Sequence, residues 1–157
     1  MNVVGIIWED FVNYKKISTT IMMPYCSFKC DKEYGTQICQ NCNLAKETKT
    51  DYNDALIINH YLDTDISRAM VFQGLEPFDS WEELSKFIQE FRSVCDDDIV
   101  IYTGYNKDDV SDYIEELKKY KDIIIKFGRY IPNEVRHFDT VLGVYLASSN
   151  QYAEKIS

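Results

Sequence analysis

The chain has 157 residues, about the length of one domain, and can bury a single core without help from disulfides. Its 45% hydrophobic and 27% charged residues, with only three prolines, argue against low-complexity or disordered segments. Seventeen basic against 26 acidic residues leave a formal net charge of −9, so the surface should repel phosphate backbones and anionic lipid. We therefore expect one domain over residues 1–157, with neither a nucleic acid nor a membrane as its partner.

Two further features bear on location and on metal binding. The start, Met-Asn-Val-Val-Gly, lacks a basic segment followed by a long apolar stretch, and no run approaches the roughly 18 apolar residues of a membrane span. We expect a cytoplasmic protein. Cysteines occur at positions 26, 30, 39, 42 and 95, and the first four fall within seventeen positions. In a reducing compartment such a cluster usually holds a metal.

Short apolar segments rich in β-branched residues predict the strands. The first, residues 18–23, runs directly into the cysteine-rich segment. Residues 68–72, 98–102 and 122–126 predict three more strands, and 141–146 is the candidate for a last one.

Helices are predicted between these strands. Residues 53–62 carry apolar side chains at helical spacing. Residues 80–83 have the form of a capping box, and one apolar stripe follows over residues 84–91. Another helix is expected to begin near Asn106.

Strands that alternate with helices at this spacing predict parallel pairing with right-handed crossovers, an α/β architecture. In such folds the working residues collect beyond the C-terminal ends of the strands. Three segments fall in that location: residues 26–42, 74–77 and 103–105. We therefore expect the functional site at this edge of the sheet.

The clustered cysteines form two pairs, C-x3-C at Cys26 and Cys30 and C-x2-C at Cys39 and Cys42. Thiolates at such spacings suit either zinc or iron–sulfur chemistry. Spacing alone leaves open a closed four-cysteine zinc site that only stabilises the loop.

The cysteine segment resembles that of the radical S-adenosylmethionine enzymes, and within them the activating proteins of anaerobic ribonucleotide reductase. The family pattern is C-x3-C-x2-C, and Cys26, Cys30 and Cys39 resemble it with six extra residues between the second and third cysteines. Asn41 matches the asparagine of the family's Cys-x-Asn, and Ile38 resembles the position that packs on the adenine ring.

The resemblance implies that Cys26, Cys30 and Cys39 are the metal ligands, with Cys42 as the alternative third ligand. Three thiolates on a [4Fe-4S] cluster leave one iron open for the amino and carboxylate groups of S-adenosylmethionine. Four ligands would block that iron and would suit an electron carrier or a zinc protein. No catalytic residue beyond the cluster ligands is implied.

Two turns resemble further family motifs. The segment from Gly74 to Pro77 resembles Gly-Gly-Glu-Pro with leucine as its second residue, which implies that Gly74, Glu76 and Pro77 bind the cofactor. Glu76 would accept a hydrogen bond from the cofactor's ammonium group. Thr103 and Gly104 match a Thr-Gly-Tyr that faces the cofactor's ribose and carboxylate side in the activating proteins.

Two other segments point to the reductase activators in particular. Residues 148–151 resemble their closing Ser-Ser-Asn-Gln, although such residues can equally form a capped terminus, in which hydroxyls and amides satisfy backbone groups. Residues 10–14 also resemble these activators, but the glycines that usually follow are replaced by Tyr14, Lys15 and Lys16.

The family resemblance implies an incomplete (β/α) barrel with mostly parallel strands, open on one side to receive a protein segment. The implied function is that of an anaerobic oxidoreductase, an iron–sulfur activase that cleaves S-adenosylmethionine reductively to a 5′-deoxyadenosyl radical. It would then install a glycyl radical in anaerobic ribonucleotide reductase, with an electron donor such as flavodoxin.

Three alternatives stay open. One is another small radical S-adenosylmethionine enzyme, with a different glycyl-radical partner or a peptide to modify. The others are a non-catalytic four-cysteine zinc module and a degenerate relative that has lost its activity.

Overall fold

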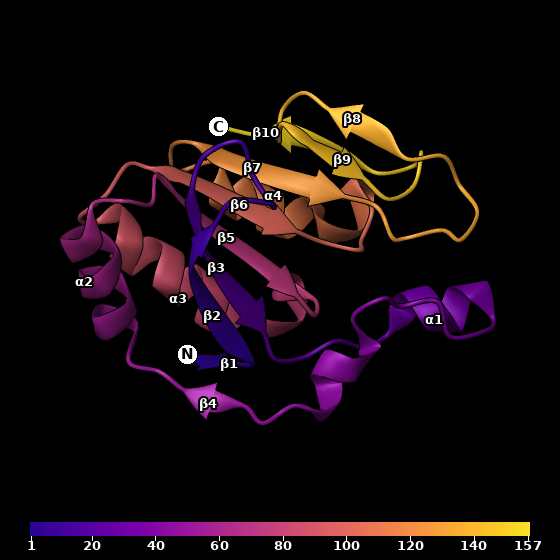
Figure 1. Ribbon diagram of the computed structural model, residues 1–157, viewed down its shortest axis with the longest axis horizontal. Helices are drawn as coiled ribbons and strands as arrows, with labels where there is room; N and C mark the ends of the chain where they lie inside the picture. The colour runs from indigo at the N-terminus through magenta and orange to yellow at the C-terminus, as the bar shows by residue number, and fades with distance from the viewer.

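The β-branched and apolar runs form one six-stranded sheet in the computed structural model, which describes residues 1–157 (Figure 1). In sheet order the strands are β10 (Tyr152–Lys155), β7 (Ile123–Phe127), β6 (Asp98–Tyr102), β5 (Ala69–Gly74), β3 (Ser18–Met23) and β2 (Gly5–Asp10). The four central strands run parallel, and both edge strands are antiparallel to their neighbours. The expected strands 18–23 and 98–102 are confirmed without any shift as β3 and β6.

The remaining elements surround this sheet. Two small antiparallel pairs join β1 (Asn2–Val3) to β4 (Thr50–Asp51) and β8 (His137–Asp139) to β9 (Val144–Leu146). The α-helices are α1 (Lys29–Tyr34), α2 (Asp54–Thr64), α3 (Trp81–Arg92) and α4 (Ser111–Leu117). Three short 3₁₀ helices span Cys42–Lys46, Pro77–Ser80 and Lys107–Val110.

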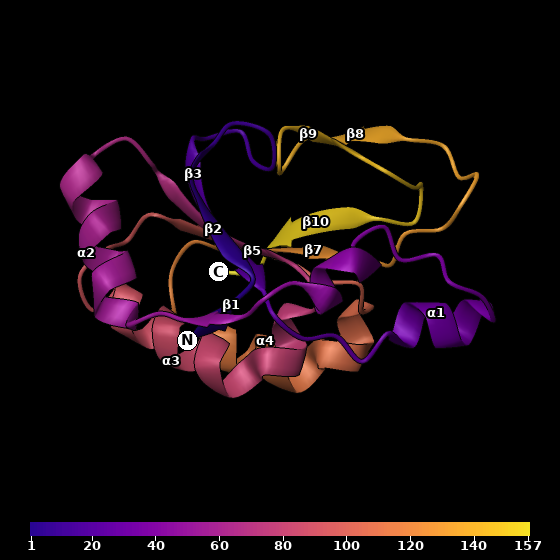
Figure 2. The ribbon, with the colours of Figure 1, turned by 60° about the horizontal axis from the view of Figure 1, so that its bottom comes forward.

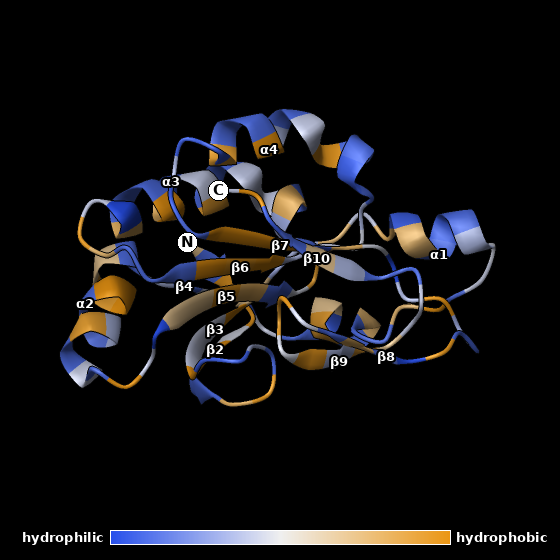
Figure 3. Cartoon of the chain, turned by 90° about the horizontal axis from the view of Figure 1, so that it is seen from above, coloured by the Kyte–Doolittle hydropathy of each residue, from blue (hydrophilic) through white to orange (hydrophobic).

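The parallel strands are buried on both faces, because side chains along a strand alternate between them. On one face Met70 and Phe72 of β5 pack with Leu84 and Phe87 of α3 in the larger core cluster. Figures 2 and 3 show α3 and α4 together on this side of the sheet. In Figure 3 the strands β6 and β7 have the colour of strongly hydrophobic residues.

The opposite face has no helix over it. Val71 and Val100 pack there with Tyr14 and Leu142, in a second cluster that includes the β2–β3 loop and the chain around the β8–β9 hairpin. Figure 2 shows this loop and hairpin on the side of the sheet away from α3 and α4.

Two sequence-based expectations about element ends are wrong. Ser80 makes no side-chain capping hydrogen bond, because the chain enters α3 through the 3₁₀ helix Pro77–Ser80, whose first amide is instead capped by Glu76. The last strand is β10, and of residues 141–146 only Val144–Leu146 are in a strand. The capping pattern at Asn106 is present, with Asp109 as its reciprocal partner.

The sheet is open, with β10 and β2 as its two edges. An incomplete (β/α) barrel of the radical S-adenosylmethionine type therefore stays a proposal. No helix has both the length and the apolar character needed to cross a membrane.

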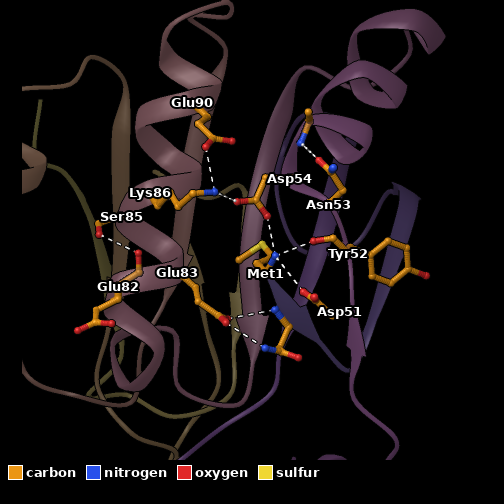
Figure 4. A network of polar contacts seen from close by, with 12 residues as sticks. Met1, Asp51, Tyr52, Asn53, Asp54, Glu82, Glu83, Ser85, Lys86 and Glu90 are labelled. Carbon is orange, nitrogen blue, oxygen red and sulfur yellow. Dashed lines mark hydrogen bonds and ion pairs between the residues drawn. The ribbon is translucent and has the colours of Figure 1, made fainter.

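Asp54 at the start of α2 joins three parts of the chain (Figure 4). Its carboxylate accepts hydrogen bonds from the amino group of Met1 at 2.7 Å and from Lys86 Nζ of α3 at 2.8 Å. Glu83, one turn earlier in α3, accepts from both the backbone and the side-chain amide of Asn2. These contacts attach β1 to the helical face of the sheet.

The β2–β3 loop is organised by one buried carboxylate, that of Asp10. Its Oδ1 accepts from Val12 N at 2.8 Å and from Asn13 N at 3.3 Å, and its Oδ2 accepts from Thr20 Oγ1 at 2.6 Å and from Asn13 Nδ2. Burial alone would raise the pKa of Asp10, but these hydrogen bonds more than offset it and hold the pKa below its ordinary value.

Asp10→Asn should lower the free energy of unfolding at pH 7 by about 1–3 kcal/mol, because an amide replaces a charged acceptor of several hydrogen bonds. Since the folded-state pKa is lowered, this stabilisation is present above the unfolded pKa of about 3.9 and is lost as pH falls through the folded value. Urea unfolding at pH 7 and at pH 3 measures both effects.

Asp63→Asn, at an exposed position of α2, is the matched control. A variant as stable as the wild type at pH 7 would show that Asp10 does not organise the loop.

Candidate metal centre

The parallel strands β3, β5, β6 and β7 bring four loops to one edge of the sheet, where they enclose a cavity of about 320 Å³. The cavity walls come from all three segments expected at this edge, and from the loop that follows β7. Eight of the ten candidate cofactor and metal residues line it: Cys26, Cys30, Ile38, Cys39, Gly74, Glu76, Thr103 and Gly104.

Two of the sequence candidates lie elsewhere. Pro77 is buried as the first residue of the 3₁₀ helix that leads into α3, and it does not line the cavity. Cys42 lies outside the cavity lining, and its Sγ accepts a hydrogen bond from Gln37 Nε2 at 2.6 Å. Cys39 and Cys42 are therefore in different surroundings.

All three cavity cysteines are free thiols that are neither fully buried nor exposed. Burial raises the pKa of each, to about 12 for Cys26, and nearby acidic groups, Glu76 among them, add to the rise at Cys26 and Cys30. Such thiols stay protonated until a cation stabilises the thiolate, so metal binding here is coupled to proton release.

The arrangement of the thiols bears on the kind of metal group that fits. No three His, Cys, Asp or Glu side chains are placed to hold a single metal ion. A tetrahedral zinc site would bring its sulfur atoms to about 3.8 Å from one another. A [4Fe-4S] cluster takes each thiolate on a different iron, so three thiols around one cavity can serve as its ligands.

The start of the cysteine segment is held by its own backbone and by the 3₁₀ helix Pro77–Ser80, which follows β5. Phe28 adopts a left-handed conformation with φ of 53°, and its N–H donates to Cys26 Sγ at 3.2 Å. Ser27 N donates to Asp79 Oδ2 at 2.5 Å. These contacts fix Cys26 just before α1, which carries Cys30 in its first turn.

The extra residues between Cys30 and Cys39 form α1 and a return loop that projects from the body of the protein (Figure 1). One side chain closes this loop: Asp31 Oδ1 accepts from Ile38 N at 2.8 Å and from Cys39 N at 2.9 Å. Asn41 then donates to Gly74 O at 2.8 Å. The insertion thus returns Cys39 to the cavity that Cys30 lines.

Glu76 is the buried carboxylate of the cavity, with 6% of its surface exposed. Its Oε1 accepts from Thr103 Oγ1 at 2.7 Å and from Phe78 N at 3.2 Å, and its Oε2 accepts from Gly104 N at 2.9 Å. Burial raises the pKa of Glu76 to about 7 although these hydrogen bonds oppose the rise. A carboxylate has about four acceptor sites, so Glu76 retains capacity for one more donor.

Two of the candidate positions leave little room for any residue larger than glycine. Gly74 has φ of 94°, and a Cβ there would lie 3.2 Å from Met22 Cα of β3. A Cβ on Gly104 would lie 3.0 Å from Cys30 Sγ and 3.7 Å from Glu76 Oε2. Both glycines therefore make room, the first for a neighbouring strand and the second for a thiol.

The Ser-Ser-Asn-Gln segment holds the loop after β7. Ser148 Oγ and Asn150 Nδ2 donate to Arg129 O, at 3.4 and 2.9 Å, and Gln151 Nε2 donates to Gly128 O at 3.2 Å. These side chains satisfy backbone groups, as the alternative interpretation of residues 148–151 expected.

The sequence prediction assigned no site role to Lys126 or Arg129, which also line the cavity. Lys126 ends the run Ile123-Ile124-Ile125, and a lysine in an otherwise apolar central strand is the signal that could have identified it. Burial lowers its pKa to about 8, although Glu76 and Cys30 oppose this. Arg129 forms an ion pair with Glu33 of α1.

Comparison with known proteins gives one result. A family model described as "4Fe-4S single cluster domain" matches residues 15–151, a range that contains all four clustered cysteines and every strand end around the cavity. No curated protein and no solved structure matches the chain.

Asp31→Ala should reduce the iron and sulfide bound after anaerobic reconstitution by at least about half. The backbone amides of Ile38 and Cys39 would lose the acceptor that holds Cys39 at the cavity. Asp31→Asn, which keeps one carbonyl oxygen, is the matched control and should retain most of the iron. Iron content equal to that of the wild type in Asp31→Ala would show that this carboxylate does not position Cys39.

Proposed function

The chain belongs to the 4Fe-4S single cluster domain family and is an iron–sulfur protein, and from that premise we propose that it is a radical S-adenosylmethionine activase. Its proposed role is to cleave S-adenosylmethionine reductively and to generate a glycyl radical on an anaerobic ribonucleotide reductase. The proposed cluster ligands are Cys26, Cys30 and Cys39.

One observation carries the proposal. Three thiols line a single cavity together with the buried carboxylate of Glu76, while the fourth clustered cysteine, Cys42, lies outside that lining. Three ligands leave one iron of a four-iron cluster available to a second molecule. An electron carrier would need no cavity beside its cluster.

When bound, a reduced cluster of this kind supplies one electron to the sulfonium of S-adenosylmethionine, which splits to methionine and a 5′-deoxyadenosyl radical. The residues of the chain bind and orient the sulfonium compound. Glu76 has one acceptor site left for its ammonium group, and Thr103 holds the Glu76 carboxylate in place. Ile38 offers an apolar surface on the cysteine side of the cavity.

The identity of the macromolecular partner rests on the resemblance of the cysteine, Gly-x-Glu-Pro and Thr-Gly-Tyr segments to the reductase activators. Residues 148–151 support it less, since their side chains bond to the loop after β7. A different glycyl-radical enzyme or a peptide substrate is the alternative for the same cavity, and a flavodoxin-like donor is the proposed source of electrons.

Single substitutions of the cysteines test the ligand assignment. Cys26→Ala, Cys30→Ala and Cys39→Ala should each lose the cluster, whereas Cys42→Ala should keep about four irons and four sulfides per chain. Iron and sulfide analysis after anaerobic reconstitution is the measurement, with Cys95→Ala as control. Loss of the cluster in Cys42→Ala and its retention in Cys39→Ala would reverse the assignment.

The activase function is tested by mixing the reconstituted, reduced protein with S-adenosylmethionine and the anaerobic ribonucleotide reductase of the same organism. Electron paramagnetic resonance should then show the doublet of a glycyl radical, and Cys26→Ala should abolish it. If 5′-deoxyadenosine forms but the reductase acquires no radical, the partner is a different protein or peptide.

A further inference from the structure

Cys42 is the one clustered cysteine to which the proposed cluster site gives no role. Its Sγ lies outside the cavity lining, where it accepts a hydrogen bond from Gln37 Nε2 at 2.6 Å. Like Cys39, it is a free thiol that is neither fully buried nor exposed. A thiol that holds no metal can still react with a neighbouring sulfur. The position of Cys42 relative to Cys39 therefore decides what this thiol can do.

Cys39 and Cys42 are the first and last residues of one tight turn. Gln40 and Asn41 are its central residues, and Asn41 has φ of −104° and ψ of 9°, close to the values of the second central residue of a type I turn. The Cα atoms at the two ends of a β-turn lie within about 7 Å of each other. Disulfides join Cα atoms that are about 4.4–6.8 Å apart, so the turn brings these two cysteines within the range of a disulfide.

The backbone on both sides of the turn is fixed. Asp31 Oδ1 accepts from Cys39 N at 2.9 Å, Asn41 Nδ2 donates to Gly74 O at 2.8 Å, and a 3₁₀ helix begins at Cys42. Burial is the main cause that raises the pKa of Cys39, and the nearby charges of Asp31 and Cys42 add to the rise. The two sulfurs are therefore neighbours whose approach needs no rearrangement of the loop.

A ligand thiol is open to damage whenever the cluster is absent. Peroxide oxidises a free cysteine to a sulfenic acid, and further oxidation gives a sulfinic acid that ordinary thiol reductants do not reverse. A sulfinic acid offers no thiolate to iron. A second thiol close by prevents the further oxidation, because it condenses with the sulfenic acid to a disulfide that reductants reopen.

We propose that Cys42 is a resolving cysteine, which condenses with the sulfenic acid of Cys39 and keeps this ligand as a reversible Cys39–Cys42 disulfide. Hydrogen peroxide first oxidises the Cys39 thiol to the sulfenic acid and releases one water. Cys42 Sγ then attacks the Cys39 sulfur, an S–S bond forms, and the sulfenic hydroxyl leaves with the Cys42 proton as a second water. The two thiols lose two electrons, and the peroxide gains them.

This inference concerns the metal-free chain and goes beyond the proposed function. It rests on that function only for the role of Cys39 as a cluster ligand.

The test treats the metal-free chain with hydrogen peroxide, alkylates the remaining thiols and maps the cysteines by tryptic digestion and mass spectrometry. Trypsin cleaves after lysine, so Cys39 and Cys42 stay together in the peptide of residues 33–46, whereas Cys26 and Cys30 fall in separate peptides, 17–29 and 30–32. A Cys39–Cys42 disulfide therefore appears within one peptide that resists alkylation. A disulfide from Cys39 to Cys26 or Cys30 would instead join two peptides.

The wild type should carry the Cys39–Cys42 disulfide in most chains. Cys42→Ser should carry sulfinic or sulfonic acid at Cys39 at least about fivefold more often than the wild type, because no thiol remains to condense with the sulfenic acid. Cys95→Ser, which also removes one thiol but keeps the pair, is the matched control and should match the wild type. Treatment with dithiothreitol should restore both thiols in the wild type.

Equal oxidation of Cys39 in the wild type and in Cys42→Ser would overturn the inference, and so would a disulfide that joins Cys39 to Cys26 or Cys30. Mapping of the wild type alone locates the disulfide, so the test stands even if Cys42→Ser fails to fold. The measurement uses neither a cluster nor S-adenosylmethionine, so a failure of the proposed function would leave its result unchanged. A cluster that persists in Cys39→Ala would instead show that the disulfide protects no ligand.

Discussion

The site depends on the parallel alignment of β3, β5, β6 and β7. Parallel strands deliver their C-terminal ends to one edge, so segments that are far apart in the sequence, including residues 26–42 and 103–105, meet around one cavity. The hydrogen bonds of Glu76 to Thr103 and Gly104 then join the loops after β5 and β6. No single segment could assemble this set of groups alone.

The cavity concentrates ionisable groups in a poorly solvated place. Its thiols and Glu76 have raised pKa values and Lys126 has a lowered one, in each case chiefly because burial disfavours the charged form. Binding of a cation by thiols in such an environment is coupled to the release of their protons. Structural ion pairs, by contrast, lie mostly at the surface.

Much of the fold could be predicted because β3 and β6 are short runs rich in β-branched and apolar residues, and their ends locate the site. The entry to α3 was mispredicted because a local pattern at Ser80 cannot reveal that Glu76 caps the preceding turn. Asp31 was not predicted for a related reason: its role depends on the amides of Ile38 and Cys39, which only the folded loop brings near. The spacing of the cysteines likewise gave no choice between Cys39 and Cys42.

The central claim is that the chain cleaves S-adenosylmethionine at a cluster with an open iron. The most direct measurement is chromatography for 5′-deoxyadenosine after anaerobic reconstitution of the chain with iron and sulfide, reduction with dithionite and addition of S-adenosylmethionine. The account predicts that 5′-deoxyadenosine appears with the wild type and not with Cys26→Ala or Cys30→Ala. A stable, reducible cluster that yields no 5′-deoxyadenosine would contradict it and would indicate an electron carrier or a degenerate relative.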